Sequence, residues 1–280
     1  MRIGVTAFLT DRTISPERFA TAAEERGYYS VYLPEHTHLP VDEATPPSLV
    51  AGVRLEDYQR SLDPFVALAA ATVVTERVRL GTGVCLVAQH DPVVLAKQVA
   101  TLDRLSKGRV VLGVGYGWNR REAADHGIDF SQRRQIAREK LLCMEQLWSV
   151  DKAEFHGRHV ELGPCYSWPK PVQQPRVRTL LGAGSGSKTF ETVAELADGW
   201  MPIGGAGVAA AIPALRQAFA EAGRPPSLAE VVVFGTVPDD AKLSHYRQSE
   251  VSEVVLRIAS GAEADMLRSL DDYTRFLAPG

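Results

Sequence analysis

The sequence predicts a (β/α)8 barrel in which residues 1–280 form one domain. Short runs rich in β-branched residues alternate with helical segments along the whole chain, in about eight repeats. Several of these runs are apolar throughout, as expected of parallel strands that are buried on both faces. A doubly wound sheet shares this alternation, but eight repeats in 280 residues match the usual size of a barrel, and no linker divides the chain into halves.

The predicted strands recur along the chain, and each is followed by a segment of helical periodicity. In a barrel, the active site lies at the carboxyl ends of the strands, so functional residues are sought there. The predicted strands are Ile3–Phe8, Ser30–Leu33, Val78–Val84, Val110–Val114, Val177–Leu181, Gly199–Ile203, Val231–Thr236 and Val251–Ile258.

Three of the predicted helices begin with a Ser or Asp directly before a proline. The side-chain oxygen accepts a free backbone N–H, and the fixed φ of proline suits the first helical position. Gly27 and Gly108 stand where helices are expected to end. Pro213 interrupts the period of Val208–Phe219, so that helix is predicted either to kink or to begin at about Ile212. The three helix starts are Ser15-Pro16, Asp63-Pro64 and Asp91-Pro92.

Two insertions interrupt the alternation of strands and helices. Pro34–Leu62 follows the second strand and contains Pro40, Pro46 and Pro47. Loops of this length in compact domains are usually lids or binding loops. Asp151–Arg176 follows the fourth helix and is rich in proline. It is expected to wrap the barrel between the fourth helix and the fifth strand, with His156 and His159 at the surface.

Charge and cysteine content exclude several classes of protein. The chain has 31 Lys and Arg against 34 Asp and Glu, a net charge of −3, which argues against binding to nucleic acid. Its longest apolar stretch, Phe65–Val74, is far shorter than the roughly 20 residues of a membrane span. Asp11 follows the first apolar residues too soon for a signal peptide, and three cysteines form no C-x-x-C pair. We therefore expect a cytoplasmic protein that does not bind membranes.

Glycines are concentrated at the ends of three predicted strands, in Gly81–Val84, Gly113–Asn119 and Gly182–Lys188. Strand-to-helix turns often contain glycine for conformational reasons alone. Glycine also lets a flat or charged ligand approach the backbone closely. Because the barrel brings all three runs to one face, they predict a bound cofactor there.

The third of these runs, Gly184-Ser185-Gly186-Ser187-Lys188, leads directly into a predicted helix. Free N–H groups and the positive end of the helix dipole suit a phosphate, and Lys188 adds charge. The run does not match the nucleotide-binding P-loop, because Ser187 separates Gly186 from Lys188. Gly113–Gly117 does not match the dinucleotide motif, because Trp118 stands where its last glycine would be. A nucleotide hydrolase and a nicotinamide-dependent dehydrogenase of the doubly wound type are therefore disfavoured.

His36 stands at the end of the second predicted strand, in a His-x-His pair with His38. A metal site would need further His or Asp side chains at other strand ends, which offer glycines instead, so no metal is expected. His36 is a better candidate for a group that donates or accepts a proton. The alternative is a histidine that only hydrogen-bonds a loop carbonyl.

Five stretches together are typical of one family. They are Ser30–His36, Thr75–Val84, Ala96–Asp103, Gly108–Asn119 and Ala197–Trp200. In this order and spacing, the chain resembles the bacterial luciferase-like monooxygenase superfamily of flavin- and deazaflavin-dependent (β/α)8 barrels. The segments Leu112–Asn119 and Ala197–Trp200 resemble most closely the branch that uses coenzyme F420.

The resemblance implies a role for each candidate residue. Gly83-Val84 would form a non-proline cis peptide that supports the ring of the cofactor, and Glu35-His36 would be a catalytic pair whose histidine faces the reactive edge of the ring. The ribityl side would be lined by Gly115, Tyr116 and Gly117, and the phosphate would be held by Gly184, Ser185, Gly186 and Lys188. Sugar-phosphate dehydrogenases of this branch have a glutamate where Trp118 stands. Trp118 is therefore expected to line a substrate pocket, and sugar-phosphate oxidation is not expected.

The sequence thus predicts an F420-dependent oxidoreductase that transfers hydride to or from a small organic substrate. A monooxygenase that uses reduced FMN and oxygen is the alternative of the same fold, because both cofactors have a tricyclic ring and a ribityl phosphate. A flavin-binding protein without catalytic activity is the alternative of another class. The resemblance also implies a homodimer.

Overall fold

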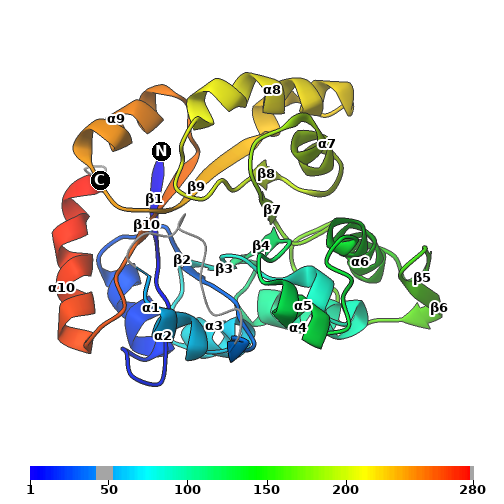
Figure 1. The fold of residues 1–280 in the computed structure, drawn as a ribbon, viewed down its shortest axis with the longest axis horizontal. Helices are drawn as coiled ribbons and strands as arrows, with labels where there is room; N and C mark the ends of the chain where they lie inside the picture. Colours follow the sequence, from blue (N-terminus) through cyan, green and yellow to red (C-terminus); the bar gives the residue numbers. More distant parts are fainter. Residues whose placement is uncertain (42–52, 278–280) are drawn as a thin grey trace.

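The computed structural model describes residues 1–41 and 53–277 and contains a closed barrel of eight parallel strands. The strands follow the order β1-β10-β9-β8-β7-β4-β3-β2 around the barrel, so the first and last strands pair and close it (Figure 1). The prediction of a (β/α)8 barrel is confirmed. The barrel strands are β1 Arg2–Thr6, β2 Ser30–Leu33, β3 Arg79–Thr82, β4 Val110–Gly115, β7 Thr179–Gly182, β8 Gly199–Trp200, β9 Glu230–Thr236 and β10 Glu253–Arg257.

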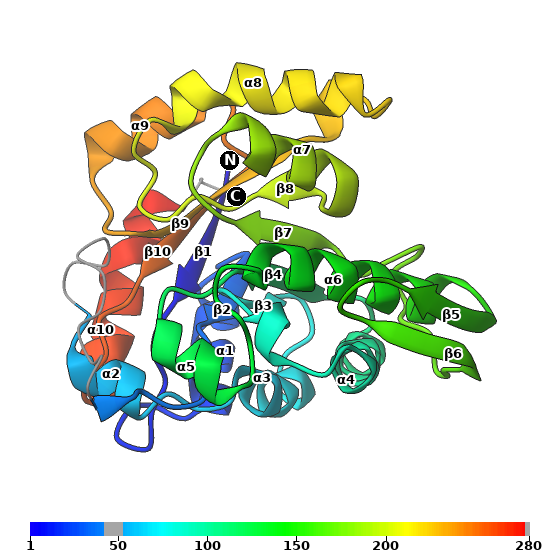
Figure 2. The ribbon, with the colours of Figure 1, turned by 45° about the vertical axis from the view of Figure 1, so that its right-hand side comes forward.

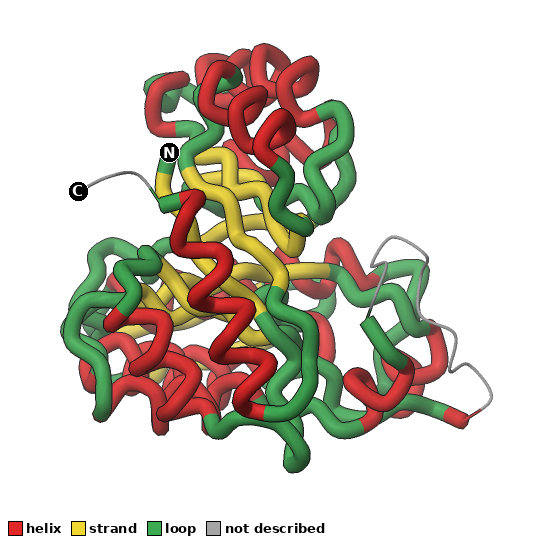
Figure 3. The backbone as a smooth tube through the Cα atoms, turned by 90° about the vertical axis from the view of Figure 1, so that its left-hand side faces the viewer, coloured by secondary structure: helices red, strands yellow, loops and turns green. Residues whose placement is uncertain are grey.

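Helices surround the strands, as the views in Figures 2 and 3 show. None of the described helices is both long and apolar enough to cross a membrane. The helices are α1 Pro16–Glu25, α2 Leu55–Gln59, α3 Pro64–Val73, α4 Pro92–Leu105, α5 Arg120–Asp125, α6 Arg133–Ser149, α7 Ser187–Leu196, α8 Val208–Glu221, α9 Asp240–Gln248 and α10 Glu263–Tyr273, with short 3-10 turns η2 Val87–Gln89, η3 Pro226–Leu228 and η4 Thr274–Phe276.

The three predicted helix starts are confirmed, and each capping side chain accepts a backbone N–H bond. Ser15 accepts from Arg18, Asp63 from Val66, and Asp91 from both Val93 and Val94. Gly27 and Gly108 follow α1 and α4 with φ of 84° and 83°, a conformation that favours glycine.

The helix that contains Pro213 does not begin at Ile212. It begins at Val208, directly after Gly207, whose φ of 71° turns the chain into the helix. Pro213 is therefore an interior residue of α8, and the second of the two predicted alternatives is wrong.

The insertion after the fourth repeat contains secondary structure that was not predicted. It contains an antiparallel hairpin of β5 Lys152–His156 and β6 Glu161–Tyr166, which projects from the barrel (Figure 2). The two strands pair only with each other and leave most side chains exposed, so they lack the apolar pattern of the barrel strands. His156 is exposed as expected, but His159 is partly buried. In the other insertion, Pro46 and Pro47 lie outside the described residues.

Apolar side chains fill both the space between strands and helices and the interior of the barrel. The interior cluster is small and closes the barrel below the ends of the strands. It consists of Tyr32, Val111, Leu180, Met201, Val232, Phe234 and Val255, with Val84 packed against it from above.

The carboxylate of Glu24, at the end of α1, accepts hydrogen bonds from the backbone N–H groups of Glu76, Arg77 and Val78. It thereby joins α1 to the segment that enters β3. Burial raises the pKa of Glu24, but the three donors outweigh this effect and hold the pKa below its ordinary value of 4.5.

Glu24→Gln is expected to lower the free energy of unfolding by about 1–3 kcal/mol near neutral pH, because three N–H groups lose an ionised acceptor. Since the folded pKa is lowered, this stabilisation is present above the pKa of the unfolded carboxyl and is lost as the pH falls through the folded pKa. Chemical denaturation at neutral pH and at about pH 3 measures both effects. Glu25→Gln, an exposed neighbour, is the matched control; equal loss of stability in the two variants would contradict the prediction.

Candidate functional site

A cavity of about 590 Å³ lies at the carboxyl ends of the barrel strands. The three glycine-rich strand ends meet in this cavity, together with the end of β2 that bears His36. Its volume is within the range of cofactor and small-molecule sites. Its lining is formed by Thr6, Ala7, Phe8, Pro34, Glu35, His36, Val53, Gly83, Val84, Leu86, Gly115, Tyr116, Gly117, Trp118, Phe130, Arg133, Arg134, Gly182, Ala183, Gly184, Ile203, Phe234, Gly235 and Arg257.

The floor of the cavity is formed by the segment that follows β3. The peptide between Gly83 and Val84 is cis, which confirms the expectation drawn from the resemblance. Backbone hydrogen bonds tie this segment to both neighbouring strands: Gly83 N–H donates to Leu33 at 2.7 Å, and Cys85 N–H donates to Gly113 at 2.7 Å. The floor is therefore fixed between β2 and β4.

The side chain of Val84 leaves room only for glycine at two positions on neighbouring strands. A Cβ at Gly115 would lie 2.3 Å from Val84 Cγ2, and a Cβ at Gly182 would lie 2.7 Å from Val84 Cγ1. These glycines are thus needed first for the close packing of Val84. Gly184 has no atom within 4 Å of such a Cβ, so it leaves open space at the edge of the cavity. The result is a smooth apolar floor that suits one face of a planar ring.

His36 forms a buried pair with Glu122. Its Nδ1 lies 3.0 Å from Glu122 Oε2, and the two side chains are 7% and 0% exposed. Glu122 Oε1 also accepts the backbone N–H of Thr37 at 3.3 Å. Because a carboxylate accepts from Nδ1–H, the pair leaves Nε2 of His36 free to accept or donate a proton in the cavity. The His36 ring packs against Tyr58 and Trp118, at centroid distances of 5.1 and 5.7 Å.

Glu122 was not among the site residues predicted from the sequence. It lies in the first turn of α5, whose capping residue Asn119 accepts the backbone N–H groups of Arg121 and Glu122. The signal was a capping Asn followed three residues later by Glu, directly after the glycine-rich end of β4. This short helix places the carboxylate of Glu122 beside His36, at the end of β2.

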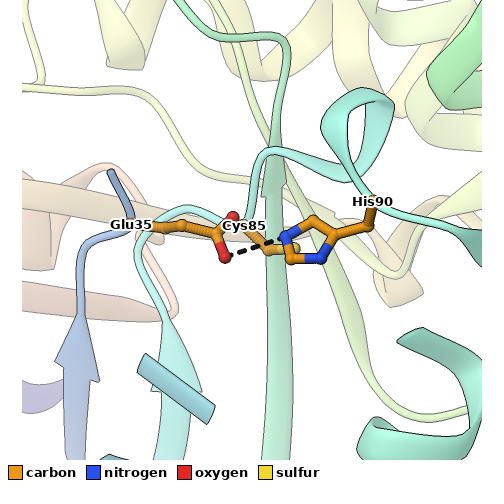
Figure 4. A group of neighbouring side chains, drawn as sticks. All are labelled: Glu35, Cys85 and His90. Carbon is orange, nitrogen blue, oxygen red and sulfur yellow. Dashed lines mark hydrogen bonds and ion pairs between the residues drawn. The ribbon is translucent and has the colours of Figure 1, made fainter. Parts of the chain in front are cut away.

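Glu35 points away from His36, because successive residues of an extended chain face opposite sides. Its carboxylate accepts hydrogen bonds from the backbone N–H of Leu86 and from Nε2 of His90, the latter at 2.9 Å (Figure 4). The side chain of Cys85 also lies against it. Glu35 therefore holds the segment that follows the cis peptide.

These contacts change the acid–base properties of both partners. Burial disfavours the charged form of His90, but the hydrogen bond and charge of Glu35 outweigh this and raise its pKa above the ordinary 6.5. Burial, with the charge of Glu35 and its hydrogen bond, raises the pKa of the Cys85 thiol well above 9.0. Among the described residues, Glu35, Cys85 and His90 are the one group with the spacing of metal ligands, but their mutual hydrogen bonding accounts for the arrangement without an ion.

The predicted phosphate site lies at the edge of the cavity. Gly186 caps α7, and Ser185, Gly186 and Lys188 are exposed beside the opening. The cavity lining extends through Gly184 but does not include these three residues. They are thus placed to contact only the part of a ligand that leaves the cavity.

Three arginines that sequence analysis did not single out gather near this end. The guanidinium groups of Arg133 and Arg120 lie 3.6 and 4.6 Å from the ring centre of Phe130, and that of Arg134 lies 5.2 Å from the ring of Tyr116. In the part of the chain that the structure describes, none of the three forms an ion pair, and Nε of Arg133 is buried without a partner. Burial and the nearby charges of Arg134 and Arg120 lower the pKa of Arg133. This cationic end suits an anionic group.

Comparison with known sequences gives a consistent set of relatives. A model of the luciferase-like monooxygenase family matches residues 15–243. The chain is 39% identical over 280 residues to an uncharacterized protein of Mycobacterium tuberculosis, covering 99% of this chain and 96% of that protein. It is 31% identical over 216 residues to an F420-dependent glucose-6-phosphate dehydrogenase of Kineococcus radiotolerans, covering 74% of this chain and 58% of the relative.

Two further comparisons extend this set. The chain is 25% identical over 247 residues to the pyrimidine monooxygenase RutA of Methylorubrum extorquens, covering 81% of this chain and 65% of the relative. Its fold is similar to that of an F420-dependent secondary alcohol dehydrogenase in complex with an F420-acetone adduct, with a TM-score of 0.77 at 18% identity over 99% of this chain and 98% of that one. The structural likeness shows the fold.

Glu35→Gln is expected to lower the pKa of His90 below its ordinary value of 6.5, because burial remains while the carboxylate charge is lost. NMR titration of the His90 ring in wild type and variant measures this shift. The ring of His156, exposed beside Glu161, serves as the internal control and should titrate equally in both proteins. An unchanged pKa of His90 in the variant would contradict the described pairing.

Proposed function

Since the chain belongs to the luciferase-like monooxygenase family and is an oxidoreductase, we propose that it uses coenzyme F420 to oxidise or reduce a small organic substrate. The observation that carries this choice of cofactor is the arginine group at one end of the cavity. Three arginines without an acidic partner in the described chain are more than one phosphate requires. Coenzyme F420 has carboxylates beyond its phosphate, whereas FMN ends at the phosphate.

The described residues fit such a cofactor. Val84, with Gly115 and Gly182 behind it, offers a flat apolar surface to the ring. Tyr116 and Gly117 would lie beside the ribityl chain, and the N–H groups of Ser185 and Gly186, with Lys188 and the arginines, would hold the phosphate and tail. When bound, the deazaflavin supplies a ring carbon that exchanges hydride with the substrate.

In this proposal, the protein positions the substrate and handles the proton. Nε2 of His36 donates or accepts the proton of the substrate oxygen, and Glu122 orients the imidazole through Nδ1. Glu35 takes part as a positioning residue, because its carboxylate holds the floor of the cavity instead of facing it. Trp118 and Phe8 exclude water beside His36.

Two alternatives remain. The first is a monooxygenase that uses reduced FMN and oxygen, which the similarity to RutA supports. The second is a flavin-binding protein without turnover. A protein of the last kind would bind the ring but exchange no hydride with any donor. Sugar-phosphate oxidation is not proposed, because Trp118 stands at the site of the glutamate that the resemblance would require. The homodimer stays a prediction.

Titration of the purified protein with coenzyme F420 and with FMN, followed by fluorescence quenching, tests the choice of cofactor. We expect tighter binding of coenzyme F420, and we expect Arg134→Ala to weaken its binding about 10-fold because a charge-assisted contact is lost. Ser185→Ala combined with Lys188→Ala should also weaken it. Arg138→Ala, on the same helix but paired with Glu195 at the surface, is the matched control. Equal or tighter binding of FMN would favour the monooxygenase.

His36→Ala is expected to retain cofactor binding and to lose about 10²- to 10⁴-fold in turnover, the usual contribution of a general acid or base. Glu122→Gln should lower turnover less, because it keeps a hydrogen-bond acceptor but removes the charge that stabilises a protonated His36. Turnover is measured with substrates found by screening alcohols, ketones and aldehydes against the loaded enzyme. Full activity of His36→Ala at saturating substrate would show that the assigned role is wrong.

A further inference from the structure

Arg257 is an arginine of the cavity that has no partner among the described residues. It is the last residue of β10 and lines the cavity, and its side chain is partly buried. Within residues 1–41 and 53–277, no hydrogen bond, ion pair or aromatic stacking contact engages its guanidinium. Burial lowers its pKa, and the neighbours that act in the opposite direction are the hydroxyls of Tyr273 and Tyr58.

Two other arginines of this barrel have several partners. Arg178, at the opposite end of the barrel, pairs with Glu230 and with the fully buried Glu253, although its Nη1 has no hydrogen-bond partner among the described residues. Arg109 donates to five acceptors near the ends of α3 and α4, including the carbonyls of Thr75 and Val78. A desolvated guanidinium without an acceptor is costly, so the lack of any described partner at Arg257 points to an acceptor that arrives with a ligand.

The carboxylates of the cavity do not supply this acceptor. Glu35 accepts from Leu86 and His90, and Glu122 accepts from His36 and Thr37. Both are therefore occupied by donors on the β2 and β3 side. Among the described residues that line the cavity, Glu35 is the one with a carboxylate, and its described donors are Leu86 and His90.

The position of Arg257 separates it from the proposed cofactor. The arginines of α5 and α6 lie beside β4 and β7, whereas β10 is the second strand from β2 on the other side, through β1. At the usual spacing of strands, the ends of β10 and β2 lie roughly 10 Å apart. The lining includes Phe8, His36 and Trp118, and the rings of all three pack against Tyr58. This part of the cavity is aromatic, with one fixed positive charge at its far end.

We infer that Arg257 binds the carboxylate of the substrate, and that the substrate is an organic acid whose apolar body lies in the cavity against Phe8 and Trp118. The inference rests on the proposed function, because it assigns the substrate side of the same cavity. A guanidinium donates two parallel hydrogen bonds to a carboxylate, and the aromatic walls disfavour a highly hydroxylated body. The reacting carbon would then be held beside Nε2 of His36, away from the anchored end.

Calorimetric titration with benzoate and with its neutral isostere benzamide tests the inference on the protein loaded with oxidised coenzyme F420. We expect the wild type to bind benzoate at least about 10-fold more tightly than benzamide, and we expect Arg257→Met to abolish this preference. Arg257→Lys should restore part of it. Arg268→Met, an exposed arginine on α10, is the matched control and should behave as wild type.

Three further results test the proposed role of Arg257. Equal binding of benzoate and benzamide by the wild type, or an unchanged preference in Arg257→Met, would overturn the inference. Thermal unfolding of Arg257→Met should occur at or above the temperature of the wild type, since no described intramolecular contact is lost and an unpaired, partly buried guanidinium is removed; a lower unfolding temperature would show that Arg257 has a structural role instead. The titration is repeated without cofactor: a preference for benzoate in a protein that fails to bind coenzyme F420 would contradict the proposed function but support the role of Arg257.

Inorganic phosphate and ethanesulfonate serve as competitors in the same titration. Weaker competition by these anions than by acetate supports a carboxylate, because the planar guanidinium then selects the planar group. Stronger competition by phosphate would overturn the assignment of substrate class.

Discussion

The contact of Val84 with Gly115 and Gly182 is the constraint on which the site depends. It requires glycine on two neighbouring strands, and it places a branched apolar side chain at the centre of the barrel mouth. Backbone bonds to β2 and β4 hold the segment from both sides, and Glu35 holds its continuation at Leu86. A ligand that lies on this floor meets a surface that does not have to rearrange on binding.

Glu35 and His36 are adjacent in the sequence but have different roles in the site. Glu35 and His36 leave β2 in opposite directions, so one carboxylate serves the floor while the imidazole faces the cavity. Each then requires a partner from a different element: His90 follows η2, and Glu122 lies on α5. Glu35-His36 at the end of β2 thus connects the residues that hold the floor of the cavity to the residues that are proposed to handle the proton.

The fold and the centre of the site could be predicted from the sequence because both depend on local patterns. The strands, the proline-capped helices and the glycine runs are set by residues that are close in sequence, and the barrel brings strand ends together without further information. The hairpin β5–β6 leaves most of its side chains exposed and buries only a few small or scattered apolar ones, so it has no continuous apolar run and was not recognised. The roles of Glu122 and Arg257 could not be predicted in this way. Glu122 matters because it pairs with His36, and Arg257 because it has no partner among the described residues, and both facts depend on the folded structure. Arg257 did leave one signal, as a charge near the end of the run Val251–Ile258, whose other charged residue, Glu253, lies near its beginning.

The charge pattern of the cavity limits how a ligand can lie in it. The chain as a whole carries a net charge of −3, yet the described cavity groups that keep an unpaired charge are arginines at two separate ends. Apolar walls between the ends strengthen and focus this field. A molecule with a long anionic tail is drawn toward α6, where several cations gather, and a molecule with one anionic group can satisfy only the single cation at β10. In the proposed arrangement, each end is matched to a different charge content, so the cofactor and the substrate would bind in one order, with their uncharged parts over Val84 beside His36.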